Sequence, residues 1–549
     1  MLKYLRVMIF LCVMQALVDA YAITRVVNFE VSGSNVTEQL RMVVKGMSRR
    51  DSLVINFAKG EFIIDGSVEM HVNTVMRGQG KDVTRLLFGN TGTFGGDSFL
   101  YFNGNKRNEL SVEISDLSCD MVHHDEQWWD TESQKYLLRF IHIKKADIHH
   151  IASHLMNAAC TTIDMIVCRN VDIHDCELIN HNNCGTGGIL WFRRDNHDIK
   201  ITDNVIEKYG DDEFLAIWEG GDDNNVWSPE KGIKENILFA NNQVRFIKHA
   251  GDKDRVCSVQ MALYNFGTDK GTAIHWSNIV FENNSFYFDA PILSLLSIRM
   301  NSGDSHEGMV FRNNQVTFTA ASGFDGNSHA DIEVHDAACS GSEVFIEGNV
   351  FTVQGIVTDR YGGNGYNHLI CDGATVRYSN NDLSARHTTI DGKTFGPTFL
   401  WVRNKGCDVT LTDNDLSGMV KLAKVDGGET RSFKLSATGN TFSGDTRIYC
   451  RDVQYADVSI VGNTFNSDCY EVLLQEFASR GKLVFKDNVV YASRGGRLFT
   501  HYDKKFGIDS MVFERLEVSG NTLNGMRQEN FLPQGMNVTH GKVKNNRFY

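Results

Sequence analysis

The sequence predicts an all-β protein, a right-handed single-stranded parallel β-helix (a solenoid) with an N-terminal cap. Two observations predict it. The 549 residues include 49 Gly and only 4 Pro, a composition typical of turn-rich β structure whose backbone N–H groups stay paired. A short phrase centred on Asn recurs along the chain, with apolar and polar residues alternating on both sides of it, which is the period of a β-strand. Because such a repeat implies stacked units, one long solenoid is expected rather than several ordinary domains.

The repeated phrase has alternating apolar residues, a polar pair ending in Asn, one variable residue and another apolar residue. Its copies are centred on Asn204, Asn242, Asn284, Asn314, Asn349, Asn381, Asn414, Asn440, Asn463, Asn488, Asn521 and Asn546. Two earlier copies carry Cys176 and Ile151 in place of Asn. The mean interval is about 31 residues, within the range of stacked repeats.

We expect each Asn to form a tight corner between two strands, in the left-handed conformation that Asn tolerates. Stacked Asn side chains can also hydrogen-bond along the solenoid as a ladder. The longer intervals are interpreted as rungs with loops inserted at another corner. The alternative is a set of unrelated turns in a β-sandwich, which the phasing of the copies disfavours.

The expected organisation has three parts: a signal peptide at 1–22, an N-terminal cap with the first rungs at 23–110, and a parallel β-helix with loop insertions at 111–549. Lys3 and Arg6 precede a short apolar run, and Ala20-Tyr21-Ala22 resembles a cleavage site, as in secretory signals. We therefore expect a secreted, periplasmic or cell-surface protein with no membrane span. The net charge of −13 makes nucleic acid an unexpected partner.

The cysteines indicate thiols rather than a disulfide framework. Removal of Cys12 with the signal leaves an odd number, hence at least one free thiol. Cys160 and Cys184 lie one rung apart, and we favour buried small residues over a disulfide between them. No Cys-x-x-Cys pair is present, so neither a zinc nor a redox site is expected.

A family resemblance rests on the N-terminal phrases. The stretch from Gln39 to Phe88 ends in an Arg-Gly-x-Gly-x-x-x-Thr-x-Leu phrase that begins at Arg77 and ends at Leu86. It resembles the N-terminal rung of the pectate-lyase-like right-handed parallel β-helix superfamily. That resemblance implies an enzyme acting on polysaccharides, often those containing uronic acids, although the superfamily also includes tailspikes and non-catalytic surface proteins.

A second phrase, Gly210-Asp211-Asp212-Glu213-Phe214-Leu215-Ala216-Ile217, resembles the Gly-Asp-Asp motif of polygalacturonases. The resemblance implies that Asp211 and Asp212 hold the attacking water of an inverting hydrolysis. The upstream position of the acid instead has glycines around Thr186, His249 matches the family's Gly-His-Gly only in part, and Arg299-Met300 stands for Arg-Ile-Lys. The alternative is a solvated acidic corner.

A second chemistry, β-elimination, needs a base and a cation that neutralises the sugar carboxylate. Lys248, His249 and Arg255 lie one rung after the acidic phrase. In lyases of this fold Ca²⁺ often bridges carboxylates to substrate, so Ca²⁺ is an optional cofactor under this hypothesis. The expected catalytic residues are therefore Asp211, Asp212, His249, Arg255 and Lys248, and surface ion pairs are the alternative.

Sugar rings stack on aromatic side chains, so substrate binding is assigned to Trp128, Trp129 and Trp218. Arg299 and Glu213, which belong to the motif-like phrases above, are assigned to substrate binding as well. A metal site of His123, His124 and His150 lacks a recognised ligand spacing, and core or surface histidines are favoured; the metal remains unknown. The polar residues cluster between 120 and 300.

Two functions follow. The first is a secreted carbohydrate-active enzyme that depolymerises a polysaccharide, expected to contain uronic acid, by hydrolysis or β-elimination in a groove on the β-helix. The alternative is a non-catalytic carbohydrate-binding or structural envelope solenoid, adhesin-like or tailspike-like. The sequence leaves the oligomeric state open.

Overall fold

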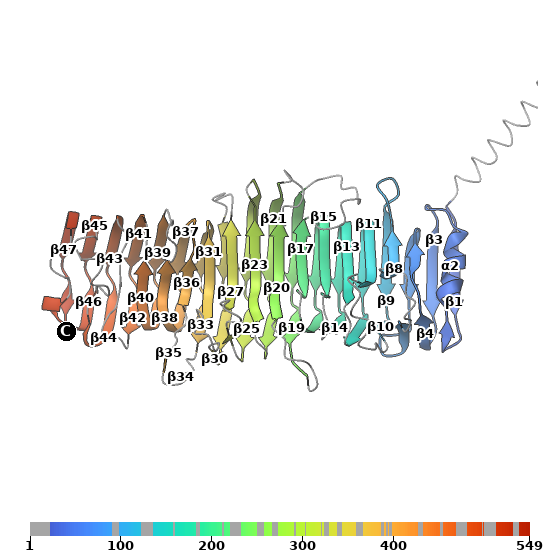
Figure 1. Ribbon diagram of the computed structural model, residues 1–549, viewed down its shortest axis with the longest axis horizontal. Coiled ribbons are helices and arrows are strands. Elements are labelled where there is room, and N and C mark those ends of the chain that lie inside the picture. The colour runs from blue at the N-terminus through green and yellow to red at the C-terminus, as the bar shows by residue number, and fades with distance from the viewer. Residues whose placement is uncertain are drawn as a thin grey trace, which may run out of the picture.

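In the computed structural model the chain is a parallel β-helix, a long solenoid of stacked rungs with three faces (Figure 1). The structure describes residues 22–89, 98–121, 135–156, 160–182, 187–210, 213–219, 232–249, 257–265, 273–289, 292–301, 303–319, 321–322, 329–336, 343–357, 366–385, 389–390, 393–394, 398–425, 432–450, 454–467, 480–496, 498, 512–530 and 537–549. The predicted fold class is confirmed. Residues 1–21 of the predicted signal peptide lie outside the described part, and the predicted boundary near residue 110 stays a prediction.

Sheet 1 is the face whose outer side carries the aromatic and charged residues considered below. It consists of β5 (Val68–Met70), β8 (Ser98–Asn103), the first halves of β11 (Lys135–His149), β13 (Cys160–His174) and β15 (Leu190–Thr202), then β17 (Leu215–Glu219), β20 (Cys257–Asn265), β23 (Ile292–Met300), β27 (His329–Asp336), β31 (Tyr366–Asp372), β36 (Thr398–Val402) and the last parts of β38 (Asp415–Val425) and β40 (Thr441–Cys450).

Sheet 2 takes up the second halves of β11, β13 and β15. Its other strands are β1 (Thr24–Phe29), β3 (Ser52–Phe57), β6 (Asn73–Arg77), β9 (Leu110–Ser115), β18 (Ile233–Ala240), β21 (His275–Glu282), β24 (Ser305–Arg312), β28 (Glu343–Glu347), β32 (Thr375–Ser379), β37 (Cys407–Thr412), β39 (Phe433–Thr438), β41 (Ala456–Val461), β43 (Gly481–Lys486), β45 (Val512–Ser519) and β47 (Asn537–Lys544).

Sheet 3 follows sheet 2 in every rung and includes the first parts of β38 and β40. Its other strands are β2 (Ser34–Asn35), β4 (Gly60–Ile64), β7 (Thr84–Phe88), β10 (Ser118–Met121), β12 (Ala152–Met156), β14 (Glu177–Asn182), β16 (Val205–Gly210), β19 (Gln243–Phe246), β22 (Ser285–Phe288), β25 (Gln315–Phe318), β29 (Val350–Val353), β33 (Asp382–Ala385), β42 (Thr464–Ser467), β44 (Val489–Gly496), β46 (Thr522–Met526) and β48 (Arg547–Phe548).

Short elements complete the described fold. The helix α2 (Thr37–Lys45) buries Leu40 and Val44 at the N-terminal end of the solenoid, where it forms the cap (Figure 1). The remaining elements are the pair β26 (Ala321–Ser322) and β30 (Ile356–Val357), the hairpin β34 (Thr389–Ile390) and β35 (Lys393–Thr394), and the 3₁₀ turn η3 (Gln528–Asn530). Among the helices of the described residues, none is long and apolar enough to cross a membrane.

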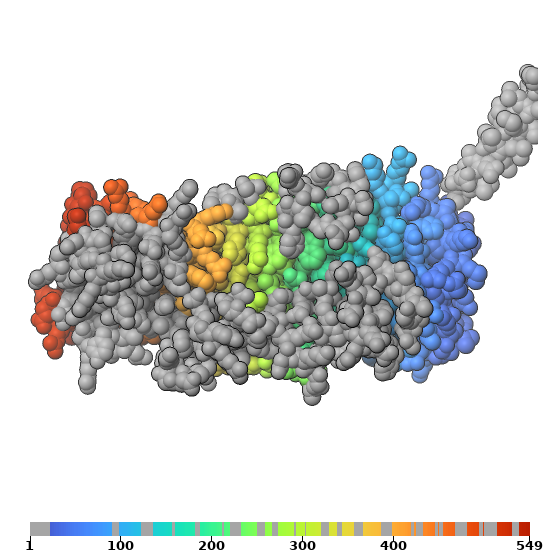
Figure 2. All heavy atoms as spheres, in the orientation of Figure 1, coloured from blue at the N-terminus to red at the C-terminus, as the bar shows by residue number. Residues whose placement is uncertain are grey.

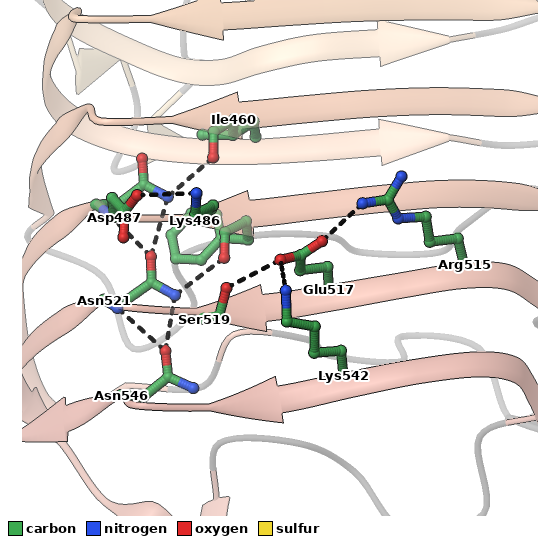
Figure 3. A network of polar contacts seen from close by, with 11 residues as sticks. Ile460, Lys486, Asp487, Arg515, Glu517, Ser519, Asn521, Lys542 and Asn546 are labelled. Atoms are coloured by element: carbon green, nitrogen blue, oxygen red, sulfur yellow. Dashed lines mark hydrogen bonds and ion pairs between the residues drawn. The ribbon is translucent and has the colours of Figure 1, made fainter.

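The corner between sheet 2 and sheet 3 is built by the predicted Asn ladder. Asn314 shows the pattern: its Nδ2 donates to the carbonyl of Phe281 and to Oδ1 of Asn349 at 3.0 Å, and its own Oδ1 accepts from the backbone N–H and Nδ2 of Asn284. The chain of bonds continues from Asn204 to Asn546. Figure 3 shows its last step, from Asn521 to Asn546. Cys176 occupies the same position one rung earlier, where its backbone N–H donates to Asn204 Oδ1.

The position of the left-handed residue corrects the sequence prediction. In all twelve Asn copies the residue with positive φ is the one before the ladder Asn: Asp203, Asn241, Asn283, Asn313, Gly348, Asn380, Asp413, Gly439, Gly462, Asp487, Gly520 and Asn545. The ladder Asn is free to turn its side chain inward because its neighbour makes the bend. This explains why the first member of the polar pair is Asn, Asp or Gly. Only these two residues separate β18 from β19 and β21 from β22, so insertions fall at the other corners, as predicted.

The core is the interior of the solenoid, filled by one apolar row per strand. Phe239, Phe281 and Phe311 stack on consecutive rungs of sheet 2 with ring centroids 6.1 and 6.3 Å apart. One part of the interior is polar: Asp331 Oδ1 lies 2.8 Å from His329 Nε2, its Oδ2 lies 2.7 Å from His368 Nδ1, and Tyr366 donates to it, all fully buried.

Candidate functional site

Two rows of side chains point outward from sheet 1, one residue per rung. Parallel pairing aligns Arg193, Trp218, Tyr264, Arg299, His335 and Asp372, which we call the outer row. A second row beside it contains Asp164, Trp191, Ala216, Ala262, Ser297 and Glu333. Adjacent strands lie about 4.8 Å apart, so the outer row is a closely spaced line of aromatic and charged groups. In Figure 2 the described atoms of the solenoid run as a band from blue through green to orange.

Arg299 is the most accessible cation of the outer row. Its guanidinium carbon lies 4.9 Å from the centre of the Tyr264 ring, and one guanidinium nitrogen lies 3.7 Å from Glu333 Oε2. Even so, 53% of the Arg299 side chain remains exposed. The ring and the carboxylate therefore hold the cation in place while leaving it able to meet an anion from solvent.

Beside Arg299, His335 lies between two carboxylates. Its Nε2 is 3.3 Å from Glu333 Oε2 and its Nδ1 is 4.0 Å from Asp372 Oδ2. Burial favours the neutral imidazole, but the interactions with Asp372 and Glu333 outweigh it and hold the pKa of His335 above its usual value.

Both carboxylates are correspondingly acidic. Burial favours the protonated form of each, yet the interaction with His335 outweighs it and lowers the pKa of Glu333 and of Asp372 below the usual values. Burial also raises the pKa of the Tyr264 hydroxyl to about 12, against the opposing charge of Arg299. At neutral pH this part of the row thus combines anionic carboxylates and a neutral phenol with an imidazole that keeps its proton to higher pH than an isolated histidine does.

The upstream part of the face is aromatic and cationic. The rings of Trp191 and Trp218 lie 4.7 Å apart, and Tyr136 meets Trp191 edge-on at 6.4 Å. Arg139 and Arg193 pack over Tyr136 at 4.6 and 5.1 Å and share the fully buried Asp164, at 3.1 and 2.7 Å. Two arginines therefore share one buried carboxylate beside the aromatic rings.

Gly188 has a packing role, which accounts for a glycine where the polygalacturonase pattern has a carboxylate. A Cβ on Gly188 would lie 2.0 Å from Nε1 of Trp191 and 2.5 Å from the Glu213 carbonyl oxygen. The lack of a side chain at Gly188 therefore lets the Nε1 edge of the Trp191 indole lie close to the backbone there. It serves packing of the face rather than acid catalysis.

The structure unites some of the predicted site residues. Trp218 and Arg299 belong to the outer row with Tyr264 between them, and Glu213 contributes to the electrostatic environment of Tyr264. Asp211, Asp212, Arg255, Trp128 and Trp129 lie outside the described residues, so their roles stay predictions. The same holds for His123 and His124 of the considered metal site.

His249 and Lys248 are on another face. They follow β19 of sheet 3, where His249 Nε2 lies 2.8 Å from Glu207 Oε1 and the Lys248 N–H donates to Asp289. His150, which the sequence grouped with His123 and His124, instead has its Nδ1 2.9 Å from that of His149.

Sequence reasoning missed Tyr264, Glu333, His335 and Asp372. Each lies at an outward position of a strand whose alternate residues, such as Ile332 and Val334, belong to the core. That alternation is visible in the sequence, but the alignment of strands from separate rungs is not, because the intervening insertions differ in length. Also missed was the buried Lys234, whose Nζ lies 3.4 Å from Glu219 Oε2 beside Trp218 and whose pKa burial lowers.

The described residues do not fit the Ca²⁺ that a lyase would use. Calcium takes six to eight oxygen ligands. Within the described part of the chain, the one group of at least three closely placed ligand side chains is His181, Glu207 and His249, with a single carboxylate. No step of the proposal below passes through calcium.

Two hollows lie on sheet 2. One, of about 700 Å³, is lined by residues including Lys145, Asp172 and Lys200, and one of about 870 Å³ by residues including Lys482 and Glu517. In the second, Glu517 is already paired with Arg515 and Lys542 (Figure 3). Neither lining contains a Trp, Tyr or Phe side chain, so sheet 1 remains the better candidate for sugar rings.

No family model and no curated protein sequence matches this chain. Among solved structures, it is similar to the A-module of the Azotobacter vinelandii mannuronan C-5 epimerase AlgE6 (9% identity, TM-score 0.27, covering 89% of this chain and 96% of that one). It is also similar to the N-terminal fragment of bacteriophage Phi29 gene product 12 (12%, 0.34, 94% and 90%) and to the PL6 family alginate lyase AlyGC (9%, 0.20, 95% and 100%). At these TM-scores, fold and function rest on the chain's own strands and side chains.

Proposed function

We propose that this chain binds a polysaccharide along the outer row of sheet 1 and cleaves it there, as a member of the pectate-lyase-like superfamily. The observation that carries the proposal is the alignment of Arg193, Trp218, Tyr264, Arg299 and His335, one per rung. A linear polymer of sugar rings needs repeated aromatic contacts along one direction, and uronic acids need cations between them.

The charges of the row favour β-elimination over hydrolysis. A glycosidase needs one carboxyl group with a raised pKa as its acid, whereas the pKa values of Glu333 and Asp372 are lowered. In an elimination, Arg299 would neutralise the uronate carboxylate and so acidify the C5 proton, which the neighbouring Glu333 carboxylate would accept. The electron pair left on C5 would form the C4–C5 double bond as the C4–O bond breaks. His335, which retains its proton to higher pH, would protonate the leaving oxygen.

The predicted export signal at 1–22 fits this function, since a polysaccharide substrate lies outside the cell. We therefore propose a secreted, periplasmic or cell-surface location. Binding without cleavage, as in an adhesin-like or tailspike-like solenoid, is the competing function.

The test is a panel of pectins, alginate and glycosaminoglycans, read by absorbance at about 235 nm for the unsaturated product of elimination and by new reducing ends. Arg299→Gln and His335→Gln should abolish cleavage. Arg312→Gln is the matched control, because Arg312 is similarly exposed and similarly paired to a glutamate, but lies on sheet 2. New reducing ends without a rise in absorbance would favour hydrolysis. Binding of a polysaccharide without cleavage would favour the competing function. Full activity of both Arg299→Gln and His335→Gln would contradict the assignment of the site to sheet 1.

A further inference from the structure

We propose that His181, Glu207 and His249 form a binding site for one divalent transition-metal ion of the Zn²⁺ class. The three residues belong to consecutive rungs of sheet 3: His181 on β14, Glu207 on β16, and His249 after β19. The site uses none of the outer-row residues and does not rest on the proposed cleavage. The absence of a Cys-x-x-Cys pair predicted no zinc site, but that prediction took account of cysteine ligands alone.

The ligand atoms are already close to a coordination geometry. Glu207 Oε1 lies 3.0 Å from His181 Nε2 and 2.8 Å from His249 Nε2, and all three atoms lie within 4.8 Å of one another. Around a tetrahedral zinc with ligand distances of about 2.0–2.2 Å, neighbouring ligand atoms lie about 3.3–3.5 Å apart. Small side-chain rotations therefore suffice to place a metal between them.

The two imidazole rings approach from different directions. Their centroids lie 4.4 Å apart at an interplanar angle of 79°, so their Nε2 atoms converge on the same carboxylate oxygen rather than stacking side by side. The His181 ring also lies against Tyr209, 6.3 Å away. Two of the three ligands are on paired strands of the solenoid, which fixes their backbone positions before the metal arrives.

Burial is graded across the site. The His181 side chain is 1% exposed, that of Glu207 14% and that of His249 49%. The buried side shields the metal from competing water, and the exposed side gives it an entry path. A fourth ligand, water or a substrate atom, would approach from the His249 side, as at sites with three protein ligands and one open position.

The ligand types select the metal. Imidazole nitrogen suits zinc, copper, iron and nickel, whereas calcium and magnesium prefer oxygen ligands throughout. Two histidines and one glutamate match a zinc set with an open position. We therefore expect Zn²⁺ and Co²⁺ to bind and Ca²⁺ to leave the site empty.

The test is Zn²⁺ titration of the chelator-treated, dialysed full chain by calorimetry, with Co²⁺ absorption as a second readout. We expect one ion per chain. Mutation of a residue that hydrogen-bonds to a metal ligand typically weakens metal binding 10–100-fold. His249→Ala and Glu207→Gln remove a ligand itself, so each should weaken binding about 100-fold or more. Millimolar Ca²⁺ should not compete.

His154→Ala is the matched control. His154 is similarly exposed and lies 2.9 Å from Asp120, but it is not part of the cluster. The affinity of the His154→Ala variant for Zn²⁺ should equal that of the unaltered protein. Because His181 is buried and its replacement could unfold the chain, His249→Ala carries the test, with circular dichroism to show that the β structure persists.

Three results would overturn the proposal. These are the absence of stoichiometric Zn²⁺ binding, unchanged affinity in both His249→Ala and Glu207→Gln, or loss of binding in His150→Ala instead. The last result would assign the metal to the exposed histidines around His149 and His174.

Discussion

The Arg299 guanidinium lies over the ring of Tyr264, 4.9 Å from its centre, on the neighbouring rung of sheet 1. This pairing joins the aromatic upstream half of the outer row to the acid–base group around His335. Neither half alone would both hold a sugar ring and move a proton. The predictions below separate the contributions of the outer row from those of the scaffold.

Trp218 should contribute to binding of the polymer rather than to its cleavage. Trp218→Ala removes an indole from the outer row, and a stacking contact of about 0.5–1.5 kcal/mol corresponds to a roughly two- to thirteenfold loss of affinity. The measurement is calorimetric titration of a substrate polymer. Tyr287→Ala, which removes an exposed aromatic from sheet 3, should bind as the unaltered protein does; an equal loss in both variants would contradict a role for sheet 1.

The pH dependence of cleavage should report the surroundings of His335. Its pKa is raised, so an acid role keeps activity to higher pH and loses it as pH rises through that pKa. Asp372→Asn removes a negative neighbour and should move the alkaline limb of kcat/KM to lower pH. An unchanged limb in this variant would show that His335 is not the acid, and histidine NMR titration gives an independent reading.

The Asn ladder should stabilise the fold strongly at each step. Asn314→Ala leaves the backbone N–H and the side chain of buried Asn284 without their acceptor. At about 1–3 kcal/mol for a buried unsatisfied group, we expect the variant to lose roughly 3 kcal/mol in urea unfolding. Asn466→Ala, which removes only an exposed contact to Ser443, should lie within about 0.5 kcal/mol of the unaltered protein.

The positive φ angle of the residue before each ladder Asn should determine which substitutions that position tolerates. Asn313 has φ 54°, so Asn313→Val should destabilise by about 1–2 kcal/mol, because a β-branched residue tolerates the left-handed region poorly. Asn313→Gly should be tolerated, since glycine already stands at the equivalent position 348. Equal unfolding midpoints for the Val and Gly variants would refute this account.

The buried Asp331 should make stability depend on pH. Burial opposes its charge, but His329 and His368 outweigh that effect and lower the pKa of Asp331. Its contribution is present above the unfolded value of about 3.9 and is lost as pH falls through the folded value. Asp331→Ala should cost about 3–5 kcal/mol at pH 7, and the gap to the unaltered protein should narrow on acidification; a gap that widens would contradict the account.

The scaffold could be predicted from local patterns in the sequence. The phased Asn copies and the two-residue period predicted the parallel β-helix and the hydrogen-bonded ladder, because each rung repeats the same local chemistry. Cys176, which replaces Asn in one copy of the repeat, also occupies the predicted corner. The one local error was to assign the left-handed conformation to the ladder Asn instead of the residue before it, because both members of the polar pair tolerate that conformation.

Which titratable side chains meet depends on how the rungs align in the folded chain. Tyr264, Arg299, His335 and Asp372 come from four strands, at intervals of 35, 36 and 37 residues. The intervals differ by single residues, and a shift of one residue moves a side chain to the opposite face of a strand. His181, Glu207 and His249 likewise come from separate rungs. Parallel pairing brings residues of successive rungs within about 5 Å, and that register depends on the whole stack rather than on any single segment.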